Sequence, residues 1–305
     1  MASAAAARGS AVPAALRAVR SVHPARKVSD GAGVPIFRSI GISPRNLDPF
    51  LMLDELEGTN DEVRGGFPSH PHRGFSTVTI LKRGAVAHKD SCGNEGIVRA
   101  GGCQWMVAGR GVVHSEMPIA DAEGRGLHGF QLWVNLPAKL KMMKPRYQDM
   151  TVDDFQTLHP APGVAVRPMA GTAHGAKGPI AIPTGEFLFL DATVQPGATW
   201  TLEDIPPAWN AFVYPYRGQG RISGAPARAR AVHVLETGPG AVTVQASGST
   251  PLEALVLAGP PIGEPIVQYG PFVMNSELEI RQAFDDYRSG ALQNPKDDVW
   301  AADDE

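Results

Sequence analysis

One short stretch of the sequence places two histidines on either side of a proline. It reads FPSHPHRGFST over residues 67–77, with His70 and His72 two positions apart. Pro71 biases the residue before it away from helix. It also cannot donate a hydrogen bond to a sheet, which confines it to an edge or a strand end. Because residues two apart in an extended segment project to the same side, the two imidazoles are expected to point together.

A second stretch adds a carboxylate to a third histidine. It reads GRGVVHSEMP over residues 109–118, and Glu116 follows His114 by two positions just after a glycine turn. Neutral imidazoles and carboxylates are ligands of first-row divalent metals. Two strands that each contribute such a pair can bring three nitrogens and one oxygen together in the mouth of a barrel. Either pair alone is more often a surface or hydrogen-bonded pair, but the two together, about forty residues apart, favour a metal site.

The other histidines are unevenly distributed along the chain. Five of the nine lie from His70 to His128, whereas the second half holds only His159, His174 and His233. These three are too scattered to form a matching cluster. We therefore expect a metal site in the first half alone.

Composition and strand patterns indicate an all-β protein. Of 305 residues, 34 are glycine and 27 are proline, and such residues interrupt helices and mark tight turns. Short apolar or alternating runs between turn signals are typical of the strands of a sandwich or barrel. They fall into two sets separated by the charged stretch 139–155. The first set is 75–84, 96–109 and 126–137, and the second is 186–194, 210–218, 240–246 and 251–259.

Charge and cysteine content narrow the function classes. The formal net charge of −3 gives no reason to expect direct binding of nucleic acid or of an anionic membrane. No run of eighteen apolar residues occurs, so no segment is expected to span a bilayer. Cys92 and Cys103 form no CxxC pair, and so few cysteines in a long chain favour a reducing compartment.

The two ends of the chain differ from its middle. Residues 1–27 are rich in alanine and serine, carry five basic side chains and precede the first acid, Asp30. This composition fits either an organellar transit peptide or a disordered tail. Near the other end, Ser276 and Glu279 have the spacing of a capping box, and Gly290 lies where a helix C-cap is expected. We predict a helix there, with a packing role.

Six blocks of the sequence closely resemble the pirins, a branch of the cupin superfamily. They are NLDPFLMLDE (46–55), GGFPSHPHRGF (65–75), HKDSCGN (88–94), QWMVAGRGVVHSEMP (104–118), HGFQLWVNLP (128–137) and EPIVQYGPFVMN (264–275). The resemblance implies an all-β fold with two cupin (double-stranded β-helix) barrels in tandem and a short C-terminal helix. It also implies one metal ion, usually iron, in the N-terminal barrel.

The family's metal ligands fall on the residues that spacing had nominated: His70, His72, His114 and Glu116. Iron is the expected ion, although copper, nickel, manganese and zinc accept the same ligands. General cupins carry a glutamate about four residues after the histidine pair, where this chain has Ser76. Glu116 must then supply the only carboxylate, and we expect Ser76 to alter the surroundings of the ligands without abolishing binding.

The resemblance also divides the chain. We expect a disordered tail or transit peptide at 1–27, the metal-binding N-terminal cupin barrel at 28–140, a linker at 141–160, a C-terminal cupin barrel without metal ligands at 161–290 that ends in the helix, and an acidic tail at 291–305.

An open coordination position on the ion would make the site reactive. Three imidazoles and one carboxylate leave one or two positions free on a five- or six-coordinate ion. Several pirins are similar to flavonol dioxygenases, which implies oxidative ring opening of quercetin at its 2,3 bond, with uptake of O2 and release of carbon monoxide. In such a reaction Glu116 would be the catalytic base that takes the proton of the flavonol 3-hydroxyl.

Two other function classes stay open. Pirins also resemble nuclear co-regulators in which the oxidation state of the iron modulates partner binding. A co-regulator of this kind would need a basic loop near the barrel entrance. The region concerned, GVPIFRSIG at 33–41, has Arg38 as its only cation, which weakens the case for a transcription-factor partner. A metal-storing or vestigial cupin without turnover is the third alternative, because ligands alone do not establish catalysis.

Partners and location follow from the same resemblance. It implies a flavonol-like small molecule and O2, and for the alternative function a transcription or signalling factor as protein partner. We expect a monomer that binds neither nucleic acid nor membrane. The expected location is the nucleus and cytoplasm, or a mitochondrion or plastid if residues 1–27 are a transit peptide.

Several residues near the predicted ligands have ambiguous roles. Four apolar residues are candidates for the wall of a substrate pocket: Phe75, Trp105, Met106 and Met117. Strand patterns bury such residues routinely, so a core position is favoured for each. His88, near Asp90, is interpreted as a surface histidine, with a gating role as the alternative. Cys103 is interpreted as a small buried hydrophobe.

Overall fold

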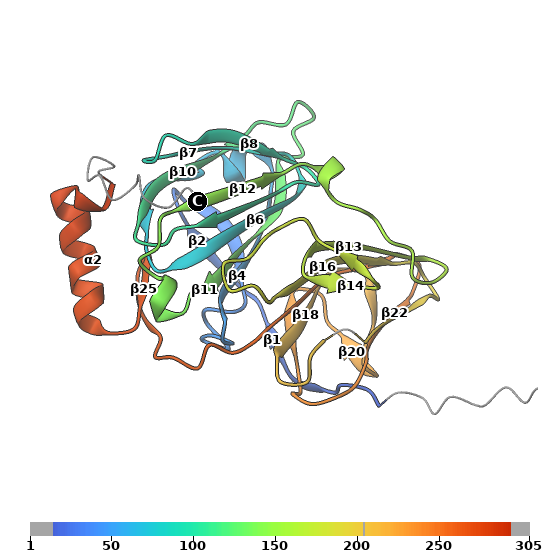
Figure 1. Cartoon of the computed structure of the whole chain (residues 1–305). Helices are drawn as coiled ribbons and strands as arrows, with labels where there is room; N and C mark the ends of the chain where they lie inside the picture. Colours follow the sequence, from blue (N-terminus) through green and yellow to red (C-terminus); the bar gives the residue numbers. More distant parts are fainter. Residues whose placement is uncertain (1–14, 204, 294–305) are drawn as a thin grey trace, which may run out of the picture.

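Two barrels of antiparallel strands lie side by side in the computed structural model, which describes residues 15–203 and 205–293 (Figure 1). The predicted all-β fold with two cupin-type barrels and a short C-terminal helix is confirmed. Each barrel is built from one large sheet and one four-stranded sheet. The large sheets of the two barrels face each other across a shared apolar core.

The N-terminal barrel combines a seven-stranded sheet, in the order β12-β9-β6-β11-β4-β3-β2, with a four-stranded sheet, β5-β10-β7-β8. Its strands are β2 (Arg26–Asp30), β3 (Val34–Arg38), β4 (Phe50–Gly58), β5 (Phe67–His72), β6 (Phe75–Arg83), β7 (Ala85–Asp90), β8 (Glu95–Arg99), β9 (Cys103–Val107), β10 (Val112–Ile119), β11 (Leu127–Asn135) and β12 (Arg146–Met150). Short helical turns lie at α1 (Asn60–Val63), η1 (Ala138–Leu140) and η2 (Val152–Asp154).

The C-terminal barrel repeats this plan with a six-stranded sheet, β1-β21-β18-β23-β16-β13, and a four-stranded sheet, β17-β22-β19-β20. Its strands are β1 (Val19–Pro24), β13 (Val164–Ala170), β16 (Leu188–Val194), β17 (Thr199–Leu202), β18 (Asn210–Arg217), β19 (Gln219–Ile222), β20 (Ala225–Ala227), β21 (Ala231–Leu235), β22 (Val242–Ser247) and β23 (Leu252–Gly259). A small hairpin, β14 (Thr172–Ala173) and β15 (Ala176–Lys177), lies outside these sheets.

Tight glycine turns connect the strands, as the composition predicts. The turn after β6 is an example, because Gly84 has a φ of 81°, a conformation that L side chains rarely adopt. A Cβ atom there would lie 2.7 Å from the carbonyl oxygen of Gly126. The chain can therefore reverse direction at this point only with a glycine.

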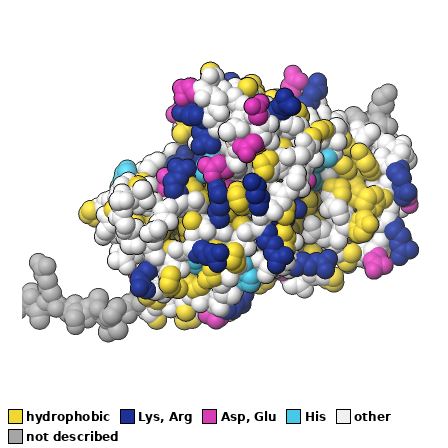
Figure 2. All heavy atoms as spheres, turned by 180° about the vertical axis from the view of Figure 1, so that it is seen from behind, with side chains coloured by type: hydrophobic (Ala, Val, Ile, Leu, Met, Phe, Trp, Pro, Cys, Tyr) yellow, Lys and Arg dark blue, Asp and Glu magenta, His cyan; other side chains and the backbone are white. Residues whose placement is uncertain are grey.

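Buried carboxylates from each barrel help to join the two barrels. Glu55 of β4 is fully buried and accepts hydrogen bonds from the hydroxyl of Tyr214 at 2.8 Å and from Nε of Arg230 at 3.3 Å. In the opposite direction, Asp191 of β16 accepts a hydrogen bond from Lys82 Nζ of β6 at 2.7 Å. Buried charges need such partners, so the pairs favour one arrangement of the barrels. On the surface shown in Figure 2, in contrast to these buried pairs, Lys and Arg side chains are spread among Asp and Glu side chains.

The N-terminal segment is structured from residue 15 onward, so the prediction of a disordered tail over 1–27 is wrong for that part. Strand β1 pairs with β21 along the edge of the C-terminal barrel. Arg17 is buried beside it and donates hydrogen bonds to the carbonyl groups of Glu236, Pro206 and Trp209. A strand that pairs with residues far away along the chain leaves no local signal. Residues 1–14 lie outside the described residues, and the transit-peptide alternative stays a prediction.

Two further boundaries differ from those predicted. Strand β12 lies within the expected linker 141–160, yet it pairs with β9 and belongs to the N-terminal barrel. The end of the expected C-terminal barrel crosses back: β24 (Val267–Tyr269), β25 (Phe272–Met274), α2 (Glu277–Ser289) and η3 (Ala291–Gln293) follow β23. Helix α2 stands against the N-terminal barrel (Figure 1).

The helix itself begins and ends where the sequence predicts. The side chain of Ser276 accepts a hydrogen bond from the backbone N–H of Glu279, and Gly290 is the C-cap with a φ of 83°. Ile280 and Ala283 are buried on the face that contacts the barrel, so the expected packing role is confirmed. The acidic tail from residue 294 lies outside the described residues.

Candidate metal centre

Strands β5 and β10 bring the two histidine-containing stretches together. They pair antiparallel, with His114 opposite His70 and Val112 opposite His72. Their register shifts between His114 and Glu116, so a bulge re-aims the carboxylate relative to the imidazole two residues before it. The extended conformation expected from Pro71 is therefore observed. Pairing of the two strands brings the histidines of β5 next to His114 of β10.

Three of the four predicted ligands form a tight cluster. The side-chain nitrogens of His70, His72 and His114 that face one another all lie within 4.8 Å. Nε2 of His70 is 3.1 Å from Nε2 of His72, and the ring of His114 lies 4.4 Å and 5.0 Å from the other two ring centres. Three imidazole nitrogens at this separation can share one small cation.

Burial keeps two of the imidazoles neutral. It lowers the pKa of His114 to about 4, and it lowers the pKa of His72 well below its ordinary value, with the neighbouring histidines adding to the effect. A neutral imidazole offers the lone pair that a metal ion needs. Both ring nitrogens of His114 and Nδ1 of His72 are buried without a partner in regular hydrogen-bond geometry. Unpaired buried nitrogens are costly, and a bound cation would satisfy some of them.

His70 is already oriented for such a role. Its Nδ1 lies 2.8 Å from the carbonyl oxygen of Pro68, so Nδ1 carries the proton and donates it. That tautomer leaves the lone pair on Nε2, which faces the other histidines. The donor set and its orientation therefore fit a first-row divalent metal ion.

Glu116 lies in the same cavity but its carboxylate is engaged elsewhere. It accepts hydrogen bonds from Oγ1 of Thr79 at 2.9 Å and from Nε2 of Gln131 at 3.0 Å and 3.2 Å. It is not among the residues whose ligand atoms lie within 4.8 Å of one another. The structure thus brings the three histidines together and places Glu116 beside them, 5% exposed, without placing its carboxylate in the cluster.

A cavity of about 590 Å³ opens in front of His70 and His72. Its walls include His70, His72, Glu116, Gln131 and Trp133. The Trp133 ring packs on the ring of Phe75 at 4.3 Å and meets the edge of His72 at 5.2 Å. The cavity is large enough for a flat aromatic molecule of drug-like size.

The wall of this cavity is not the one considered from the sequence. Phe75, Trp105 and Met106 are fully buried core residues, which confirms the favoured core position for each. For Met117 the favoured core position is wrong, because it is 38% exposed, and it does not line the cavity either. Trp133 supplies the aromatic wall instead. Its place on β11, one strand away from β6, depends on sheet order and left no motif in the sequence.

Three other expectations near the site have mixed outcomes. The prediction of His88 as a surface histidine is wrong, because it is 5% exposed and lies opposite Glu116 across β7 and β10. Its Nε2 lies 3.6 Å from Asp149. Cys103 is fully buried, and burial raises the pKa of its thiol, which confirms a small buried hydrophobe. Ser76 is buried with its hydroxyl unpaired.

A second group of possible ligands, Glu55, Glu57 and His128, lies between the barrels. The guanidinium of Arg230 contacts both carboxylates, and His128 Nε2 lies 3.1 Å from Glu55. A fixed cation already neutralises this group, so it is a weaker candidate for a metal ion than the three histidines.

Comparison with known proteins assigns both halves of the chain to one family. The Pirin profile matches residues 34–134, and the Pirin C-terminal cupin domain matches residues 189–293. A pirin-like protein of Solanum lycopersicum is 44% identical over 269 residues, which cover 87% of this chain and 89% of that protein. Human pirin is 40% identical over 284 residues, which cover 90% of this chain and 93% of that protein.

A solved structure agrees with these relatives. The crystal structure of quercetin 2,3-dioxygenase from Acinetobacter baumannii superposes with a TM-score of 0.82 at 31% sequence identity, and the match covers 91% of this chain and 99% of that one. Among the described residues, no helix combines the length and the apolar character that crossing a membrane requires.

Proposed function

Because the chain belongs to the pirin family of the cupin superfamily, we propose that its N-terminal barrel binds one iron ion and catalyses flavonol 2,3-dioxygenation. His70, His72, His114 and Glu116 are the proposed ligands. The observation that carries the proposal is the cluster of three imidazoles, two of which line a cavity of about 590 Å³. A structural metal site would be closed, whereas this one faces free space.

The proposed substrate is a flavonol such as quercetin, together with O2. The Acinetobacter baumannii protein of similar structure carries the name quercetin 2,3-dioxygenase, and this name supports the substrate class. Trp133 offers a flat aromatic surface beside His72. A planar ring system can lie against it, because aromatic rings stack favourably at an offset.

Glu116 is the residue placed to handle the proton of the substrate. When bound, the iron ion would polarise the flavonol 3-hydroxyl and 4-carbonyl and supply the redox chemistry toward O2. Glu116 takes the 3-hydroxyl proton as a general base. Thr79 and Gln131 hold the carboxylate in the cavity, and the low exposure of Glu116 excludes bulk water from the proton it accepts.

Oxygen uptake tests this function directly. Iron-loaded protein with quercetin under air should consume O2 and release carbon monoxide in equal amounts. Glu116→Gln keeps the shape of the side chain but removes the base, so we expect turnover to fall by roughly 10²–10⁴-fold. Wild-type protein with a full equivalent of iron that consumes no O2 with quercetin would refute the proposal.

The redox-dependent regulator has less support. Arg38, the only cation of 33–41, donates hydrogen bonds to Asp54 at 2.9 Å and 2.7 Å and to Asp30 at 2.6 Å. Two carboxylates therefore neutralise it, and it is poorly suited to recruit an acidic partner. The protein partner, the monomeric state and the location in nucleus and cytoplasm stay predictions.

A further inference from the structure

The roof of the metal cavity comes from the far end of the chain. Gln268, Gly270 and Pro271 line the same cavity as His70 and His72. They belong to the hairpin of β24 and β25, in which Val267 pairs with Met274 and Tyr269 with Phe272. About two hundred residues separate this hairpin from β5, so the site is completed by a segment outside the N-terminal barrel.

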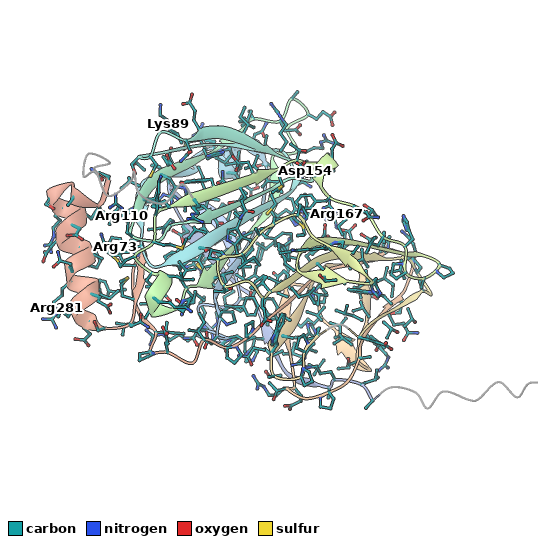
Figure 3. The ribbon with its side chains drawn as sticks, in the orientation of Figure 1. Arg73, Lys89, Arg110, Asp154, Arg167 and Arg281 are labelled. Carbon is teal, nitrogen blue, oxygen red and sulfur yellow. The ribbon has the colours of Figure 1, made fainter. Side chains whose placement is uncertain are left out.

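The residue next to His72 is the first point of attachment. The carbonyl of Arg73 accepts a hydrogen bond from the backbone N–H of Val273 at 3.1 Å. The guanidinium of Arg73 pairs with Asp286 of α2 at 2.7 Å and donates to the carbonyl of Arg110. Figure 3 shows Arg73 and Arg110 between the barrel and α2. The C-terminal segment thus holds both the backbone and the side chain of the residue that follows His72.

A buried lysine is the second point of attachment. Lys141 is 1% exposed, and its Nζ donates to the carbonyl of Gly74 at 2.8 Å, to Oδ1 of Asn135 at 2.7 Å and to the carbonyl of Val273 at 3.0 Å. All three protons of the ammonium group have acceptors. One of these acceptors lies two residues after His72 and another lies in the hairpin, so a single charge ties the two segments together.

Close packing reinforces these polar contacts. A Cβ atom on Gly74 would lie 2.0 Å from the carbonyl oxygen of Val273, so the two backbones touch. Val273 packs with Phe75 and Leu51, and Phe272 packs with Leu292 and with α2. The turn at Arg73 and Gly74, which follows His72, therefore packs against the C-terminal segment.

We propose that the C-terminal segment, residues 267–286, positions the metal ligand His72, with Asp286 and Lys141 as positioning residues. This inference rests on the metal centre proposed above. The segment fixes the backbone of Arg73 and Gly74 and thereby sets the direction of the His72 imidazole toward His70 and His114. Mutation of residues that orient a metal ligand typically costs about 10–100-fold in metal affinity.

Cobalt(II) binding to two neighbouring helix variants tests this role. Asp286→Asn removes the charge that holds Arg73, whereas Asp285→Asn removes an exposed carboxylate that pairs with Arg288 on the same helix. We expect Asp286→Asn to weaken cobalt(II) binding about tenfold and to shift the visible d–d bands of the bound ion. Asp285→Asn should match the wild type in both measurements.

A second variant and a stability measurement separate positioning from general loosening. Lys141→Met keeps most of the side-chain stem and removes the ammonium group, and it should shift the d–d bands in the same direction. Urea unfolding should show a larger loss of stability for Asp286→Asn than for Asp285→Asn, because Asp286 pairs with the buried Arg73 and the pair of Asp285 is exposed. Cobalt(II) affinity and spectra are therefore compared in buffer without urea, where each variant is folded. Asp286→Glu, which restores a carboxylate, should recover part of the lost affinity.

The outcomes are distinguishable from failure of the proposed function. Equal cobalt(II) affinity and identical spectra for the Asp286→Asn and Asp285→Asn proteins would overturn this inference alone. A wild-type protein that binds no cobalt(II) would overturn the metal centre, and this inference with it. A lack of oxygen uptake together with the expected cobalt(II) results would refute only the catalytic proposal and would support this inference.

Discussion

The two barrels share one strand plan and differ in what fills them. The four-stranded sheet β5-β10-β7-β8 of the N-terminal barrel has the same order as β17-β22-β19-β20 of the C-terminal barrel. The large sheets match in the same way, with β9-β6-β11-β4 in one and β21-β18-β23-β16 in the other, and the next strand outward is β12 in one and β1 in the other. The two sets of strands recognised in the sequence therefore follow one topology.

The strand register makes the barrels comparable position by position. His114 lies opposite His70 in the N-terminal barrel, and Val244 lies opposite Trp200 in the C-terminal barrel. Carrying the register along both strands places buried apolar side chains wherever the N-terminal barrel has a candidate ligand. The equivalent pairs are His70 and Trp200, His72 and Leu202, His114 and Val244, and Glu116 and Ala246.

The difference teaches that interior side chains, and not the barrel, decide whether a site exists. The interior of the C-terminal barrel is an apolar cluster that includes Trp200 and Leu202. The N-terminal barrel gives up such contacts for unpaired imidazole nitrogens and a cavity of about 590 Å³. One barrel is filled for stability, whereas the other keeps space and polar groups at some cost in packing.

Replacing one tryptophan in each barrel by alanine should give the largest difference in stability between the two barrels. Trp200 is 1% exposed in a filled interior, so Trp200→Ala should lower the free energy of unfolding by about 3–5 kcal/mol. Trp133 borders a cavity that already exists, so Trp133→Ala should cost less, about 1–2 kcal/mol. Urea unfolding measures both. Equal losses would mean that the N-terminal barrel is packed as tightly as its partner.

Replacing His114 by the residue found at the equivalent position of the C-terminal barrel should largely remove metal binding from the N-terminal barrel. His114→Val places in the N-terminal barrel the side chain that Val244 supplies in the other. We expect iron(II) affinity to fall at least about 100-fold, or about 2.7 kcal/mol, because one of three clustered nitrogens is lost. His159→Gln, a change of a scattered histidine, is the control. Dialysis and elemental analysis give the stoichiometry, and a full equivalent of metal in His114→Val would contradict the ligand assignment.

The buried histidine should also make the metal-free N-terminal barrel sensitive to acid. Burial lowers the folded-state pKa of His114 to about 4, below the value of about 6.5 expected in the unfolded chain. As the pH falls through this window, the unfolded chain takes up the proton first, so the stabilising difference is fully present above pH 6.5 and is lost toward pH 4. Between pH 6.5 and 5 the free energy of unfolding should fall by about 2 kcal/mol.

The difference between wild type and His114→Val, unfolded in the presence of a chelator, isolates this effect. The valine at position 114 cannot bind a proton, so the variant should lose less stability than the wild type over the same pH range. If the two proteins lose stability in parallel, the proton uptake belongs to other groups.

The sequence predicts what depends on near neighbours along the chain. The two pairs at 70–72 and 114–116 are predictable because strand geometry sends positions two apart to one side. The helix caps at Ser276 and Gly290 are local in the same way. The family resemblance supplied the count of barrels, which does not follow from the spacing of strands, whereas the distribution of histidines along the chain already limited the expected metal site to the first half.

The rest depends on pairing between distant segments. Strand β1 joins the C-terminal barrel through β21, and the hairpin of β24 and β25 returns to roof the cavity. Neither crossing has a local signature. Trp133 and Gln131 reach the cavity because β11 lies between β6 and β4. Their role appears only when the sheet order is known, and the same holds for the hydrogen bonds that turn Glu116 away from the histidine cluster.

The smallest expected effect concerns the hydroxyl that holds Glu116. Thr79→Val removes the donor at 2.9 Å from the Glu116 carboxylate while keeping the shape of the side chain. Because Gln131 still donates to Glu116, we expect iron(II) affinity to change only about three- to tenfold, and stability by about 1 kcal/mol. Thr243→Val on β22 of the filled barrel is the matched control and should leave iron(II) affinity unchanged. If Thr79→Val and Thr243→Val changed iron(II) affinity to the same extent, the hydrogen bond from Thr79 to Glu116 would contribute to stability alone. That hydrogen bond would then not be part of the functional difference between the two barrels.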